Sequence, residues 1–359
     1  MAACGHTEPF DPPNLGNDLP FNPSPPIQLT LNQGPDRGAS WLPDGSAILY
    51  SSQQLDTQDN DVCLGVLPAT GGRQRARTCT LSSEGNNLTE SLESAAAQAD
   101  GRLAYVAAAS EIAAVAPFDE SLVLASLSDP VTRTPLLAIP YIIPGRQAHL
   151  GISQLHWLNS DRLLYLGETV ILSRPCELCP RDTLRSGLDA VSLSVDGSGA
   201  VGAPEAIPGT ENASGISPGS TTDEIYYTLN GDTRVYRRAL STGEVVVAHD
   251  FGGAGIARDV HVAGDRLTCV VGGRVHFAID PALGPLQWDS GGIVHVLGLT
   301  DGSDLTLSGP DALYRRPRLS PQGTAVVAER YPLILVSPDG IQVDTVVARD
   351  GDLYLFGQP

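Results

Sequence analysis

Arginine and histidine are the residues whose positions in this sequence could support binding chemistry. Several arginines stand at or just before short apolar segments, and His156 and His261 lie inside two such segments. The arginines of this set are Arg37, Arg146, Arg258, Arg315, Arg316 and Arg318. A guanidinium binds a carboxylate through two parallel hydrogen bonds, so arginines gathered in an otherwise acidic chain could attract a carboxylate or an acidic peptide.

A structural role is the alternative interpretation for each of these residues. The arginines could instead bond backbone carbonyls at strand edges, or pair with Asp36 and Asp259, which are close by in the sequence. His156 and His261 could face a ligand or a metal ion, or they could be hydrogen-bonded packing residues. The sequence leaves both interpretations open. The candidate binding residues are Arg146, His156, Arg258, His261, Arg315, Arg316 and Arg318.

Motifs for catalysis do not accompany these residues. The chain has no G-x-S-x-G nucleophile elbow, no H-E-x-x-H zinc motif and no glycine-rich phosphate loop that opens a helix. The glycine-rich stretch "FGGAGIARD", which begins at Phe251, is predicted to be a connecting loop. We therefore expect no catalytic residue, no metal site and no cofactor.

The composition predicts a folded chain that avoids polyanions. Hydrophobic residues make up 42% of the 359 residues, which is enough for a substantial core. The formal net charge is −19, and all 22 basic residues are arginines. Phosphate backbones repel such a chain, so we expect no nucleic-acid partner. No apolar run reaches the roughly 18–20 residues that a membrane-spanning helix needs.

Two of the six cysteines are placed symmetrically about a turn. Cys63 and Cys79 flank the pair Gly71-Gly72, and each lies at the same distance in sequence from Gly71, within a strand-like segment. This symmetry places the two cysteines opposite one another on a β-hairpin, at a separation that a disulfide can span. Disulfides persist in oxidising compartments, so the pair favours an exported protein.

Cys176 and Cys179 form a C-x-x-C pair in "RPCELCPR". Pro180 disfavours the helix that a redox-active pair needs, and no second C-x-x-C or spaced histidine pair supplies further zinc ligands. The pattern favours a structural disulfide in a loop, with a metal site and redox chemistry as the alternatives. Cys269 lies in the apolar run "RLTCVV" and is predicted to be a buried free thiol.

The first residues, Met-Ala-Ala-Cys-Gly, resemble the end of a bacterial lipoprotein signal, with methionine where leucine is usual. We expect lipid attachment at Cys4, with the charged and apolar parts of the signal upstream of Met1. An ordinary cysteine near a disordered tail is the alternative. The next residues are rich in proline, and such a segment extends by about 3.1 Å per residue. Residues 1–26 are therefore predicted to be a lipid-attachment cysteine and a tether.

A strand–turn–strand pattern recurs along the rest of the chain. Its first copy is "RGASWLPDGSAILYSS" from Arg37 and its last is "RRPRLSPQGTAVVAER" from Arg315. The turns carry Asp44, Asp100, Asp161, Asp223, Asp265 and Gln322. This spacing leaves room for two further strands in each repeat. The pattern predicts an all-β fold, a six-bladed β-propeller of four-stranded antiparallel blades that fills residues 27–359 as one domain. A seven-bladed ring is the alternative.

These repeats resemble the blades of bacterial TolB-like propellers, whose usual core reads W-S-P-D-G before an alternating strand. The best copy is "WLPDG" from Trp41, and the next is "LSPQG" from Leu319. The resemblance covers nearly the whole chain and implies a fold rather than a function. TolB itself carries an α/β domain ahead of its propeller, where this sequence has the proline-rich arm, so we do not carry over its role.

Two segments could close the ring of blades. The segment "IQLTL" at Ile27–Leu31 could supply the outer strand of the last blade, or the final "DLYLFG" could do so instead. The surplus segment "GPLQWDSGGIVHVLGL" in the fifth repeat could be an extra hairpin.

From these features we expect a non-catalytic exported propeller that is lipid-anchored to a membrane and faces the periplasm or another extracytoplasmic space. Its expected partner is a protein of the cell envelope or of a membrane-bound complex, for which it would be a docking or accessory subunit. A receptor for a small anionic ligand or glycan in the channel mouth is one alternative. A propeller enzyme with a metal ion in its channel is the other.

Overall fold

The computed structural model describes most of the chain beyond residue 24. Its described residues are 25–31, 34–53, 62–79, 88–111, 119–140, 146–173, 182–185, 188–272, 274–280, 284–290, 292–309, 312–336, 343–347 and 351–357. Cys4, Cys176 and Cys179 lie outside them. Within these ranges every regular element is a strand, apart from one 3₁₀ turn at Gly252–Ala254. No helix in this part of the chain is long and apolar enough to cross a membrane.

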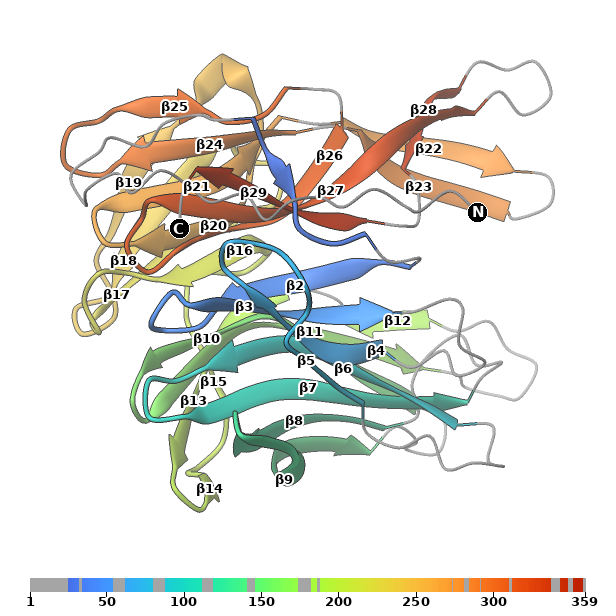
Figure 1. Cartoon of the computed structure of the whole chain (residues 1–359), viewed down its shortest axis with the longest axis vertical. Coiled ribbons are helices and arrows are strands. Elements are labelled where there is room, and N and C mark those ends of the chain that lie inside the picture. The colour runs from blue at the N-terminus through green and yellow to red at the C-terminus, as the bar shows by residue number, and fades with distance from the viewer. Residues whose placement is uncertain are drawn as a thin grey trace, which may run out of the picture.

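Four sheets have a four-stranded antiparallel path and form separate blades (Figure 1). The first is β10 (Arg146–Asn159), β11 (Arg162–Ser173), β13 (Leu188–Asp196) and β14 (Gly199–Ala200), with β12 (Asp182–Arg185) and β15 (Glu205–Ala206) paired at its sides. The second is β16 (Ala213–Pro218), β17 (Glu224–Leu229), β18 (Arg234–Ala239) and β19 (Val245–Asp250). The third is β20 (Ala257–Ala263), β21 (Arg266–Val271), β24 (Ile293–Gly298) and β25 (Asp304–Thr306). The fourth is β26 (Ala312–Leu319), β27 (Ala325–Val336), β29 (Asp352–Gly357) and β1 (Ile27–Gln28), with β28 (Val343–Val347) paired to β27.

The first two repeats form one eight-stranded sheet instead of two separate blades. Its strands are β2 (Asp36–Trp41), β3 (Ala47–Gln53), β4 (Val62–Pro68), β5 (Ala76–Thr78), β6 (Leu88–Ala97), β7 (Arg102–Glu111), β8 (Asp119–Ser126) and β9 (Asp129–Pro140). The short strand β5 covers only Leu64–Val66 of β4, so Val62 is left to pair in parallel with Ser91 of β6. The described sheets therefore give four separate blades, and the prediction of six, with its alternative of seven, is wrong as a count of separate sheets.

The position of a strand within its blade decides how much of it is buried. The second strand of a blade is covered on both faces by neighbouring blades, and six of the seven residues of β3 are buried. Such strands read as continuous apolar runs. The outer strand β19 has no buried residue, and Val245 and Val247 keep 41% and 49% exposure. Burial therefore follows the position of a strand in its blade, and hydrophobicity alone does not distinguish the apolar outer strand β19 from a buried one.

Apolar cores lie between consecutive repeats, and one of them closes the ring. Six buried clusters occur among the described residues, and each combines side chains of two successive repeats. One joins Leu49 of the first repeat to Leu92 and Tyr105 of the second, inside the eight-stranded sheet. Another packs Trp41 of the first repeat against Leu355 of the last. The blades are thus held mainly by burial of the apolar faces between them.

Strands from the two ends of the described chain lie side by side in the last blade (Figure 1). Ile27 pairs with Leu355 and Gln28 with Tyr354, which makes β1 the outer strand beside β29. Thr30 Oγ1 then accepts a hydrogen bond from Leu353 N at 2.9 Å. The predicted role of "IQLTL" as the closing outer strand is confirmed, while "DLYLFG" is the strand next to it.

One predicted strand of the fifth repeat is placed differently. The segment "RVHFAID" forms β22 (Arg274–Asp280), which pairs with β23 (Gly284–Ser290) in a separate two-stranded sheet. The third strand of that blade is β24, which follows the hairpin. Periodicity could not separate them, because both segments alternate in the same way.

The predicted disulfide is present. Cys63 and Cys79 are bonded, with a Cα–Cα distance of 4.6 Å, and they extend the pairing of β4 with β5 at Leu64 and Thr78. The hairpin symmetry about Gly71 in the sequence is therefore real, with Gly71 and Gly72 both at positive φ in the turn. Cys269, as predicted, is a buried free thiol.

Removing this disulfide should weaken the fold. The double variant Cys63→Ala/Cys79→Ala should lose about 3 kcal/mol of unfolding free energy, because the open chain regains the entropy of the closed loop. Urea unfolding followed by tryptophan fluorescence measures the loss. Reduced wild-type protein, which keeps both side chains, separates the lost cross-link from lost packing. An unchanged midpoint in both samples would show that the hairpin is held without its disulfide.

Candidate functional site

The innermost strands of the repeats surround a channel. These strands are β2, β6, β10, β16, β20 and β26; each contacts the next, and β26 contacts β2. Every one of them has a shift of register against its second strand, at its middle or near its start. A bulge turns its extra residue out of the hydrogen-bond ladder. Because the bulges lie at similar positions in the innermost strands, their extra residues face the channel at about the same depth.

The bulges hold residues in an unusual backbone conformation. Gly38, Ser94, Gln154, Asp259 and Arg316 occupy equivalent places in five of the innermost strands, with φ between 46° and 65°. Glycine adopts positive φ without strain, whereas each of the other side chains costs about 1–3 kcal/mol there. Four of the five bulge residues carry polar side chains despite this strain. The recurrence indicates that polar side chains are needed at these positions of the innermost strands.

These polar side chains form a connected network across the channel. Gln154 Nε2 donates to Asp259 Oδ1 at 2.9 Å, and Arg316 N donates to Asp259 Oδ2 at 3.1 Å. Glu329, on β27, accepts from Gly38 N at 2.7 Å and from Arg316 Nη1 at 3.1 Å. Tyr331 Oη donates to the second oxygen of Glu329 at 2.8 Å. Both oxygens of each carboxylate at this position therefore accept hydrogen bonds from the protein itself.

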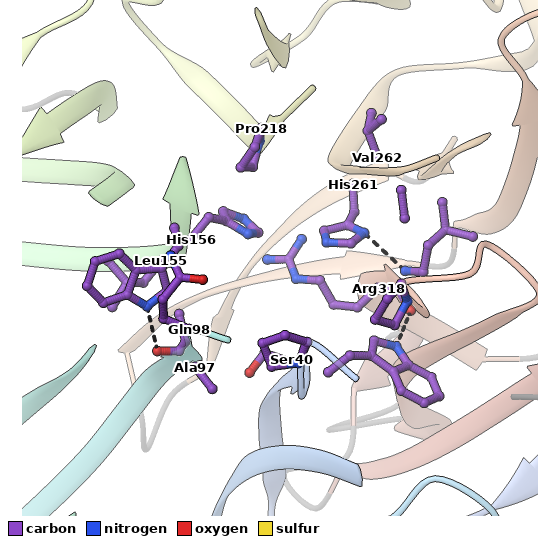
Figure 2. A pocket seen from close by; sticks show the side chains of 16 residues that line it. Ser40, Ala97, Gln98, Leu155, His156, Pro218, His261, Val262 and Arg318 are labelled. Atoms are coloured by element: carbon purple, nitrogen blue, oxygen red, sulfur yellow. Dashed lines mark hydrogen bonds between the residues drawn. The ribbon is translucent and has the colours of Figure 1, made fainter. Parts of the chain in front are cut away.

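A cavity of about 300 Å³ lies beside this network, at the end of the channel where the innermost strands turn into the second strands (Figure 2). Every repeat contributes to its wall. The contributions include Ser40, Ala96, His156, Pro218, His261 and Arg318. Trp41 and Leu319 add apolar surface to it. A small cavity with apolar walls and a few polar groups is the usual form of a small-molecule or side-chain binding site.

Arg318 is the buried charge of this cavity. Its residue is only 5% exposed, and Nη1 has no hydrogen-bond partner among the described residues. Its backbone carbonyl accepts a hydrogen bond from Trp41 Nε1 at 2.9 Å. This bond holds the backbone of β26 and does not involve the Arg318 guanidinium. Burial lowers the pKa of Arg318 to about 10, so the guanidinium stays charged at neutral pH. The charges of Asp259 and Glu329 favour the charged form, but a buried cation with no ion-pair partner among the described residues is costly unless something binds it.

Two imidazoles accompany Arg318, and Figure 2 shows its side chain reaching toward them. The rings of His156 and His261 have centroids 5.6 Å apart. His261 Nδ1 accepts a hydrogen bond from Leu319 N at 3.1 Å, so the neutral ring carries its proton on Nε2. His156 Nε2 is buried without a partner. Burial lowers the pKa of both histidines well below the ordinary value, and the charge of Arg318 lowers both further.

The other predicted arginines fall into structural roles or outside the described side chains. Arg37 pairs with Glu93 at 2.6 Å, and Arg258 Nη2 donates to Gly272 O at 2.9 Å. Arg315 lies over the ring of Tyr331, 5.6 Å from its centroid. Arg316 pairs with the fully buried Glu329. Arg146 begins β10, and its side chain lies outside the described part of the chain.

The structure thus brings Arg318, His156 and His261 together at one cavity, whereas Arg37, Arg258, Arg315 and Arg316 do not line it. Gln154 and Glu329 belong to the same channel but were not predicted from the sequence. Gln154 could not be predicted, because it lies in a bulge and a bulge interrupts the alternation of side chains from which strands are recognised in a sequence. Glu329 stands on a second strand, inside "VVAERYPL", where nothing in the sequence distinguishes it from an exposed charge.

The histidine pair should make folding stability depend on pH. Because their pKa values are lowered in the folded protein, the unfolded chain binds more protons below about pH 6.5. Stability present above that pH should therefore fall as the pH falls, by up to about 1.4 kcal/mol per pH unit for each histidine.

Urea unfolding at pH 7.5, 6.5 and 5.5 in a sulfonate buffer measures this slope. His156→Gln should reduce the slope, while His249→Gln, a substitution on the outer strand β19, is the matched control. An identical slope in wild type and His156→Gln would mean that His156 does not resist protonation in the fold.

No family model and no curated protein matches this sequence. Solved structures do match the fold. TolB from Acinetobacter baumannii matches with a TM-score of 0.50 and 16% identity over 88% of this chain, which spans only 65% of the TolB chain. A gluconolactonase from Xanthomonas campestris matches with a TM-score of 0.53 and 12% identity, over 93% of this chain and 89% of that one.

A putative TolB from Agrobacterium tumefaciens is also similar, with a TM-score of 0.45 and 12% identity over 91% of both chains. At such identities the similarity concerns the fold and carries no activity with it. The antiparallel blades, the closing outer strand and the TolB match agree with one another. The protein is a β-propeller, and its fold is similar to that of TolB.

Proposed function

We propose that this chain is a non-catalytic exported binding protein that docks a protein partner of the cell envelope or of a membrane-bound complex. The observation that carries the proposal is the cavity at the channel end, where Arg318 and His156 offer buried nitrogen atoms with no partner among the described residues. The guanidinium nitrogen favours a bound group that supplies an acceptor, and the imidazole nitrogen becomes a further donor to that group once it is protonated. An acidic side chain or chain end of the partner would meet this need.

The ring that carries this cavity is built from four separate blades and one eight-stranded sheet. The eight-stranded sheet contains two strand–turn–strand repeats, and its halves meet through an apolar core of the same kind that lies between the separate blades. The single parallel pair of Val62 and Ser91 joins these two repeats at one point. A rigid ring of this kind suits docking, because binding costs little ordering of the scaffold.

The chain is anchored to the membrane through lipid on Cys4 and faces the periplasm or an equivalent extracytoplasmic space. The Cys63–Cys79 disulfide supports an oxidising compartment. The closing strand β1 begins at Ile27, directly after the proline-rich arm of residues 1–26. The arm would then hold the propeller away from the lipid surface while β1 fixes it to the last blade.

A receptor for a small anionic ligand is the second candidate function. The cavity volume of about 300 Å³ favours it, because this volume is at the lower end of the range for small-molecule sites. Both functions place an anionic group in the same cavity and differ in what carries that group.

Lipid anchoring predicts the behaviour of Cys4→Ala. With a bacterial lipoprotein signal placed ahead of Cys4, the wild type should sediment with membranes and the variant should be released in soluble form. Membrane fractionation with detection of the propeller measures this. Cys269→Ala, which changes a buried thiol, is the control and should stay with the membrane. Membrane retention of Cys4→Ala would contradict the anchor.

Docking at the channel end predicts where a partner can be cross-linked. A photo-reactive residue in place of Pro43, an exposed residue of the cavity wall, should capture one defined protein in cells. The same residue in place of Val245, on the exposed outer strand β19, is the control and should not capture it. Cross-links from position 245 alone would move docking to the outer edges of the blades.

A further inference from the structure

We propose that the channel-end cavity binds a single carboxylate group on Arg318, and that His156 takes up a proton as this carboxylate binds. The inference rests on the proposed function only in taking this cavity as the binding place. It adds the chemistry of the bound group and a dependence on pH.

Among the described residues no carboxylate forms an ion pair with Arg318, although the charges of Asp259 and Glu329 act on it. Asp259 accepts from Gln154 Nε2 and from Arg316 N. Glu329 accepts from Gly38 N, Arg316 Nη1 and Tyr331 Oη. Neither forms an ion pair with Arg318 among the described residues, while the Arg318 side chain is buried in the cavity wall. A buried guanidinium of this kind favours a planar anion that two of its N–H groups can hold.

The walls of the cavity favour a carboxylate over phosphate. Away from Arg318 and the two imidazoles, the lining includes Pro43, Pro218 and Pro321, which have no backbone N–H to donate. Ser40 and Gln98 also line the cavity, and both side chains already donate to backbone carbonyls. Leu155 and Val262 add apolar surface. Phosphate brings four oxygens that need donors on all sides, whereas a carboxylate has two oxygens on one side and a carbon on the other. The carbon end of an acid fits the apolar part of the wall.

Only one of the two histidines, His156, is placed to take up a proton. Protonation of His261 would place a second N–H against the N–H of Leu319, which already donates to Nδ1 at 3.1 Å. His156 Nε2 has no such donor in front of it, and a backbone hydrogen bond with Ile216 favours its charged form. A proton on His156 Nε2 makes it a second cationic donor for the carboxylate.

Charges that face His156 come from two neighbouring strands. Arg318 on β26 repels the protonated ring, and His261 on β20 does so to a lesser degree. Asp259, also on β20, is occupied by Gln154 and Arg316. A carboxylate between Arg318 and His156 would cancel the repulsion by Arg318, so binding raises the pKa of His156. By linkage, acidification from pH 7.5 to 5.5 must then strengthen binding.

Acetate is the probe, titrated into the full-length chain by calorimetry at pH 7.5 and 5.5 in sulfonate buffers, with sodium chloride and phosphate as competing anions. We expect acetate to bind at least tenfold more tightly at pH 5.5, with proton uptake seen as a heat that changes with the buffer. His156→Gln should bind acetate with an affinity that no longer changes with pH. Equal affinity of the wild type at both pH values, or tighter binding of phosphate than of acetate, would overturn the proposal.

Arg318→Gln separates binding from folding. It should abolish acetate binding while the urea midpoint stays equal or rises, because it removes a buried charge that has no ion-pair partner among the described residues. Arg316→Gln is the matched control on the same strand: it should lower the midpoint, since it leaves the buried Glu329 without its cation, yet retain acetate binding. Loss of stability in Arg318→Gln with unchanged acetate binding would show a purely structural arginine.

A second titration distinguishes a carboxylate of a protein partner from that of a small acid. An acetylated peptide with one aspartate and the matched asparagine peptide are titrated beside acetate. Tighter binding of the aspartate peptide assigns the site to a protein partner, and tighter binding of acetate assigns it to a small acid. If no carboxylate binds while position 43 still captures a protein, the carboxylate inference fails and the proposed docking function stands.

Discussion

The innermost strand of a blade has one edge with no strand beside it, and the ring depends on how that edge is satisfied. Backbone N–H and C=O groups on a buried edge need partners, and side chains of the neighbouring repeat supply them here. Gln154 accepts from Ile216 N at 3.0 Å, and Ser217 accepts from Val262 N at 2.9 Å. Glu329 accepts from Gly38 N, and Trp41 donates to Arg318 O, so the last repeat is tied to the first.

This constraint explains why polar residues recur at positions that a simple core would fill with apolar ones. An acceptor that reaches the neighbouring strand must leave its own ladder, and the bulges at positive φ achieve this at the expense of local strain. The strain at Gln154, Asp259 and Arg316 is offset by the hydrogen bonds that these residues make between repeats. The apolar cores supply most of the stability. The hydrogen bonds of the bulge residues fix the position of one repeat against the next.

The sequence predicted those features that are set by neighbouring residues. The turn in "WLPDG" and the symmetry about Gly71 are local, so the repeats and the Cys63–Cys79 disulfide could be inferred without a structure. The pairing of Val62 with Ser91 could not, because it follows from how little of β4 the short strand β5 covers. The partnership of Gln154 with Asp259 joins residues 105 positions apart and leaves no trace in local periodicity.

The arginines also show that sequence spacing does not determine the role of a residue, because that role depends on its partners in the fold. Arg315, Arg316 and Arg318 stand together in one segment, and the sequence gives no reason to treat them differently. In the fold, Arg315 lies on Tyr331 and Arg316 pairs with Glu329, while Nη1 of Arg318, in the cavity wall, has no hydrogen-bond partner in the described part of the chain. The bulge between Arg315 and Arg318 produces this difference, since it turns consecutive side chains toward separate surroundings. Partners in the folded protein, and not spacing in the sequence, thus distinguish two arginines with structural contacts from the one whose guanidinium lines the cavity.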